Sequence, residues 1–108
     1  MASPVIKKSI RHYEGVIDGA ETVTEEIACM FMRPMDLLIY DSTMGGATVS
    51  VEHSPDGGTT WFDWGSVSLT AEGYASFYPP TQGVLRIKQT SGDDHSIKWA
   101  LRTSAQPR

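Results

Sequence analysis

The chain has 108 residues, with 13 acidic and 9 basic side chains and a formal net charge of −4. This length suits one domain that buries its core without metal or disulfide support, and the ordinary composition excludes a disordered chain. No stretch has the length of a signal-peptide core or of the roughly 20 apolar residues in a membrane span, so we expect a protein made in the cytoplasm with no membrane partner.

The first nine residues predict an extended N-terminal arm in front of a single domain at 10–108. Pro4 resists regular pairing, and two apolar residues and two lysines follow it. The lysines carry charge opposite to the acidic middle of the chain, so the arm is expected to gain order by lying on a partner, the alternative being a frayed terminus. The candidate contact residues in the arm are Val5, Ile6, Lys7 and Lys8.

The segment 27–32 is apolar on both faces of a predicted strand. A strand of this kind is buried on both sides, either under a loop or the arm, or in a subunit contact. In the second reading Met30 and Met32 are contact residues, because flexible methionines suit protein interfaces. Cys29, the only cysteine, cannot form an internal disulfide and is expected to be a buried thiol.

Alternation of apolar and polar residues predicts strands throughout, and no window predicts a helix. Turn residues recur about every 8 to 12 positions, the spacing of a sandwich or barrel. The fold class is therefore an all-β antiparallel β-sandwich of jelly-roll type. The expected strands are 10–17, 22–32, 36–41, 48–52, 60–64, 66–71, 74–78, 84–88 and 97–102, and the expected inward-facing residues are Val49, Val51, Leu85, Ile87, Ile97, Trp99 and Leu101.

One motif stands out between two of these strands. Residues 54–61 resemble the Asp-box pattern S-x-D-x-G-x-T-W at every defined position. In sialidases the Asp box recurs on several propeller blades, away from the catalytic centre, so the resemblance implies a structural hairpin turn and no activity. A propeller needs at least four blades, which this chain cannot supply. The turn residues are Ser54, Asp56, Gly58, Thr60 and Trp61.

No other pattern carries chemistry. The three histidines lie far apart without metal-ligand spacing, and there is no nucleophile elbow or phosphate-binding glycine loop. We therefore assign no catalytic, cofactor-binding or metal-binding residue and expect a protein that is not an enzyme. The turn at 91–94 is read as solvated, with weak calcium binding as the alternative. Both ends of the chain are basic and the middle is acidic, a distribution that argues against nucleic acid.

The aromatic residues of the central stretch offer a second function. Aromatic planes can stack on sugars, and Asp63 and Glu72 could bind sugar hydroxyls, so a carbohydrate-binding module is the alternative function. The same residues also fit a sandwich core. The aromatic residues concerned are Trp61, Phe62, Trp64, Tyr74, Phe77 and Tyr78.

Taken together, the strand-only body, the N-terminal arm and the stretch 47–62 resemble the small β-sandwich proteins that decorate tailed-phage particles. This resemblance implies a capsid decoration or cement protein without catalysis. It would be assembled in the host cytoplasm into the virion and would bind the capsid or another virion protein. Such proteins are often homo-oligomers, in many cases trimers. A tail or head-fibre component is the alternative within this class.

Overall fold

The computed structural model describes residues 3–9, 12–18, 23–28, 34–80, 82–91 and 95–103. All regular secondary structure in these residues is β-strand, as the period-2 alternation predicted. The strands are β1 (Val5–Ser9), β2 (His12–Asp18), β3 (Ile27–Ala28), β4 (Met35–Thr43), β5 (Thr48–Ser54), β6 (Phe62–Leu69), β7 (Gly73–Phe77), β8 (Val84–Thr90) and β9 (Ser96–Thr103).

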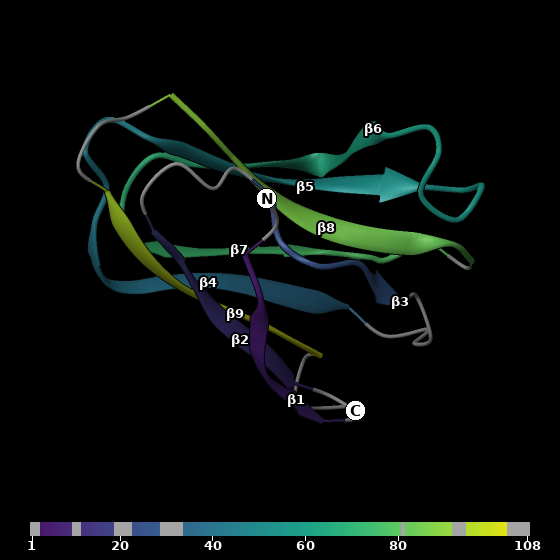
Figure 1. Cartoon of the computed structure of the whole chain (residues 1–108), viewed down its shortest axis with the longest axis horizontal. Helices are drawn as coiled ribbons and strands as arrows, with labels where there is room; N and C mark the ends of the chain where they lie inside the picture. The colour runs from purple at the N-terminus through teal and green to yellow at the C-terminus, as the bar shows by residue number, and fades with distance from the viewer. Residues whose placement is uncertain are drawn as a thin grey trace.

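Two antiparallel sheets pack face to face (Figure 1). The five-stranded sheet has the order β1-β2-β9-β4-β7, and the four-stranded sheet has the order β3-β8-β5-β6. The pairs β2–β9, β3–β8, β4–β7 and β5–β6 nest inside one another along the chain, so the chain is one long antiparallel hairpin wound around the core. This is a jelly roll, the predicted fold class, with β1 added at the edge beside β2.

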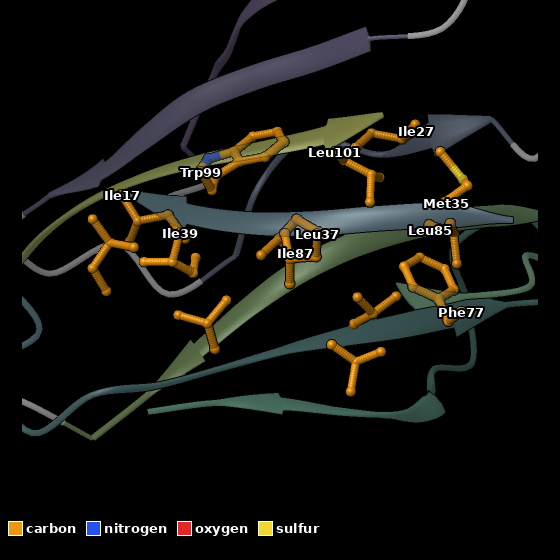
Figure 2. Close-up of a cluster of buried hydrophobic side chains, with 14 of the residues drawn as sticks. Ile17, Ile27, Met35, Leu37, Ile39, Phe77, Leu85, Ile87, Trp99 and Leu101 are labelled. Atoms are coloured by element: carbon orange, nitrogen blue, oxygen red, sulfur yellow. The ribbon is translucent and has the colours of Figure 1, made fainter. Parts of the chain in front are cut away.

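The core fills the gap between the sheets, where alternate side chains of every long strand meet (Figure 2). All seven residues predicted to point inward are buried, none more than 1% exposed. Trp99 on the central strand β9 is the largest of the fully buried side chains. Further core positions in predicted strands are Ile17, Leu37, Ile39 and Phe77, and Met35 joins them one residue before the predicted strand 36–41.

The segment expected as an N-terminal arm is extended, and it packs on its own domain. Residues 5–9 form β1, which pairs with β2, and Val5 is buried in the core. The Ser3 amide donates to the Val23 carbonyl at 2.7 Å, and the Ser3 carbonyl accepts from the Glu25 amide at 3.0 Å. The N-terminal segment therefore joins β1 of one sheet to the chain that leads into β3 of the other.

Two strand predictions need correction. The segments expected as separate strands, 60–64 and 66–71, form the single strand β6. A bulge accommodates the glycine that suggested a break, because Gly65 and Ser66 both have positive φ, 73° and 55°. The strand expected at 22–32 is represented among the described residues by Ile27–Ala28 alone. Residues 23–26 form only the isolated bridges Ser3–Thr24 and Val23–Lys88, and residues 29–32, with Cys29, Met30 and Met32, lie outside the described residues.

The close approach of the N-terminal segment to β2 gives a test of this packing. A Cβ added at Gly15 would lie 2.8 Å from the Pro4 carbonyl oxygen and 3.0 Å from Cζ2 of Trp99. We expect Gly15→Ala to lower the free energy of unfolding by about 1 to 3 kcal/mol in urea titrations, because backbone must move to admit the methyl group. Ser68→Ala, at an exposed strand position, serves as the control and should change it by less than about 0.5 kcal/mol. Equal stability of both variants would contradict the described packing of Pro4.

Candidate functional site

The Asp-box turn joins β5 to β6 and is held by one carboxylate. Oδ1 of Asp56 accepts the Ser54 hydroxyl at 2.7 Å and the backbone amides of Thr59 and Thr60 at 3.1 and 2.9 Å. The Ser54 hydroxyl oxygen in turn accepts the Gly58 amide at 2.7 Å. These bonds satisfy backbone amides of the turn that have no partner on a neighbouring strand. This is the structural role that the motif predicted.

These hydrogen bonds favour the charged form of the aspartate. The Ser54 hydroxyl is the main cause, followed by the Thr60 amide, and together they hold the pKa of Asp56 well below its ordinary value. The side chain is exposed, so little burial opposes its charged form. The turn therefore depends on an ionised carboxylate.

The last residue of the motif connects the turn to the outer face of the four-stranded sheet, the face turned away from the core. Nε1 of Trp61 donates to the Gly58 carbonyl at 3.2 Å, and the Arg86 guanidinium carbon lies 4.0 Å from the centre of the Trp61 ring. Arg86 also donates from Nε to Oε1 of Glu52 at 2.8 Å, and Nζ of Lys88 lies 3.2 Å from Oε2 of the same carboxylate. Glu52 is thus a nearly buried charge with two cationic partners, as buried charges require.

Beside this stack lies an open groove of about 330 Å³ on the same sheet. We call it the hydroxyl groove, because five of its eight lining residues are serine or threonine. None of these five hydroxyls, nor the exposed carboxylate of Asp63, has a hydrogen-bond or ion-pair partner among the described residues. The lining residues are Thr48, Ser50, Asp63, Ser66, Val67, Ser68, Lys88 and Thr90.

The central aromatic residues do not form one flat platform. Phe77 and Tyr74 both lie on β7 of the five-stranded sheet, where Phe77 is buried in the core and Tyr74 is exposed. Nε1 of Trp64 donates to the Tyr78 carbonyl at 2.7 Å, and its ring packs edge-on against His53 at 5.0 Å between ring centres. These aromatic residues therefore do not share one face of the sandwich, because neighbouring side chains of a strand point to opposite faces.

The outer face of the five-stranded sheet carries a different surface. Strand register places Leu38 between Ala100 on β9 and Tyr74 on β7, with Val16 and Tyr40 in the next row on either side of Lys98. Tyr40 and Tyr74 are well exposed. We call this surface the apolar strip. It consists of the exposed Tyr40 and Tyr74 and the half-buried Val16 and Leu38, with Ala100 buried among its neighbours at its centre.

The predicted contact residues of the N-terminal segment differ in their exposure to solvent. Val5 is buried in the core and is not available to a partner. Ile6 is 64% exposed on β1, at the edge of the sheet that carries the apolar strip. Lys7 and Lys8 are also exposed, and Lys8 pairs with Glu25 at 3.1 Å. A contact role for Ile6, Lys7 and Lys8 stays a prediction.

Sequence reasoning missed both outer surfaces. The alternation in β4 and β9 shows which residues point away from the core, but only the strand order 2-9-4-7 places Ala100 beside Leu38. The serines and threonines of the hydroxyl groove come from the hairpin β5–β6 and from β8, which is more distant in sequence.

Within the described part of the chain, no three His, Cys, Asp or Glu side chains come together as a possible metal site. The described residues also contain no helix that is long and apolar enough to cross a membrane. Comparisons with protein-family models, curated proteins and solved structures found no match.

The hydrogen bonds of Asp56 predict a specific dependence of stability on pH. Its folded-state pKa lies below that of the unfolded chain, so the carboxylate stabilises the fold above about pH 4, the ordinary aspartate pKa, and this contribution is lost as the pH falls through the folded-state value. Asp56→Asn should melt several degrees below the wild type at pH 7, and the gap should narrow progressively below about pH 4.

Thermal unfolding between pH 7 and pH 2 measures this difference. Asp63→Asn is the matched control, because Asp63 lies on the next strand, is exposed and has no partner among the described residues. The control should follow the wild-type curve. A gap between Asp56→Asn and the wild type that stays constant with pH would show that the carboxylate charge is not what holds the turn.

Proposed function

We propose that this chain is a non-enzymatic virion structural protein, a capsid decoration or cement protein that acts through protein contacts. The apolar strip is the observation that carries this proposal. Its apolar and aromatic side chains lie side by side on a rigid sheet, and tyrosine is enriched at protein interfaces. A contact built on strands keeps its shape in every copy, which suits a repeating lattice.

Charged residues lie beside and within the apolar strip. Arg102 and Asp36 are register partners in the row next to Leu38, and Lys98, which lies between Val16 and Tyr40, pairs with Asp41 at 2.8 Å. An apolar centre with a polar rim lets a partner exclude water from the centre while the charges select its orientation.

The fold is compatible with this function, and the support it gives is an analogy. Eight-stranded jelly rolls build viral capsid domains and also lectin domains, so fold alone does not choose between them. The apolar strip favours a protein partner over a sugar. In our proposal copies of this chain associate through the strip into a homo-oligomer, and that oligomer binds a repeating protein surface.

Charge placed in the apolar strip should disrupt this association. We expect Leu38→Glu to lower the mass measured by light scattering from that of an oligomer to that of a monomer, because the new carboxylate would be buried without a partner. Circular dichroism should still show a β spectrum. Tyr74→Ala, at an exposed position that leaves the core untouched, should weaken the oligomer in the same direction.

Thr90→Glu is the matched control, since it adds the same charge at an exposed position on the other sheet. It should leave the mass unchanged. A wild-type protein that stays monomeric at its highest soluble concentration, with an amide spectrum independent of concentration, would contradict the proposal.

A further inference from the structure

We propose that the hydroxyl groove is a binding site for a neutral saccharide. The proposal goes beyond the structural role above and concerns the opposite face of the sandwich. It rests on what lines the groove, how charge is distributed around it and how its walls are fixed.

The lining offers hydrogen-bonding groups that nothing in the described chain uses. A serine or threonine hydroxyl both donates and accepts, and the carboxylate of Asp63 accepts from up to two directions. The strand register brings them together, because Ser50 faces Ser68 on one side and Lys88 on the other, and Thr48 faces Thr90. A ligand that is itself a cluster of hydroxyls, each a donor and an acceptor, matches this lining.

The charges around the groove cancel, which favours a neutral ligand. Glu52 and Asp63 supply two negative charges, and Arg86 and Lys88 supply two positive ones. Lys88 is already directed to the nearly buried carboxylate of Glu52. A phosphate or nucleic acid would require an excess of positive charge that the groove does not offer.

The walls of the groove are fixed. Thr48, Ser50 and Lys88 lie on paired strands in the middle of the sheet, where backbone hydrogen bonds hold both neighbours. On the remaining side, the bulge at Gly65 and Ser66 shifts the register of β6 against β5. The stack of Trp61 on Arg86 braces the neighbouring Glu52. Pre-formed polar walls hold a ligand at less entropic cost than a loop that must first become ordered.

The size and character of the groove favour a small polar ligand. A volume of about 330 Å³ falls at the small end of ligand sites. Val67 is the single apolar residue in the lining, and the remaining apolar surface comes from the aliphatic carbons of polar side chains. The groove therefore offers no second apolar side chain to a hydrophobic ligand.

Titration of the 15N-labelled full chain with defined sugars tests this site. The neutral probes are maltose, lactose and chitobiose, and the charged probes are sialyllactose and inorganic phosphate. We expect at least one neutral disaccharide to give saturable amide shifts at Ser50, Ser66, Ser68 and Lys88, with a millimolar dissociation constant. The charged probes should bind more weakly or not at all.

Asp63→Asn should weaken binding of that sugar about tenfold, because a hydrogen bond to a charged acceptor is lost. The substitution is at an exposed side chain without a partner among the described residues, so the fold should be kept. Asp36→Asn, on the outer face of the other sheet, is the control and should leave binding unchanged.

Three results would overturn the proposal: no saturable shift with any neutral sugar, shifts that map outside the groove, or an unchanged affinity in Asp63→Asn. Tighter binding of phosphate or sialyllactose than of any neutral sugar would also overturn it. The mass of the protein in solution is measured separately, so failure here is distinguishable from failure of the apolar strip as a protein contact.

Discussion

The ionised carboxylate of Asp56 holds the point at which the whole chain reverses. The jelly roll is a hairpin wound on itself, and the Asp-box turn joins its innermost pair, β5 and β6. The other nested pairs close progressively longer stretches of chain, up to β2 with β9. The turn sets the register beside it, with His53 opposite Phe62, and the bulge in β6 then shifts the register so that Ser50 lies opposite Ser68.

The same turn prepares the outer face of the four-stranded sheet. It brings the Trp61 ring onto Arg86, and Arg86 in turn covers Glu52. Beyond this stack the bulge in β6 opens the sheet surface where the small hydroxyl side chains lie. The Asp-box turn and the hydroxyl groove are therefore neighbours. The turn fixes the start of β6, and the shape of the groove depends on the path of β6 after the turn.

The two outer faces differ in chemistry, and the difference suits two separate contacts. One presents tyrosine, leucine and valine, and the other presents hydroxyls with balanced charge. Since the core separates them, a protein bound to the first would leave the second open to solvent. The N-terminal segment supports this arrangement, because Ser3 bonds across to Val23 and Glu25 and ties the sheets together along one edge.

Local sequence patterns predicted the inward-facing residues of several strands and the Asp-box turn. Period-2 alternation identified the inward residues of β5, β8 and β9, because successive side chains of a strand point to opposite faces, and spaced Ser54, Asp56 and Thr60 identified the turn. The sequence predicts an arm at 1–9, because no local pattern indicates that residues 5–9 pair with β2. The break expected at Gly65 became a bulge because β5 continues to pair on both sides of it. Strand order alone placed Ala100 beside Leu38 and Thr48 beside Thr90, since residues far apart in the chain become neighbours through hydrogen bonds that no short window of sequence contains.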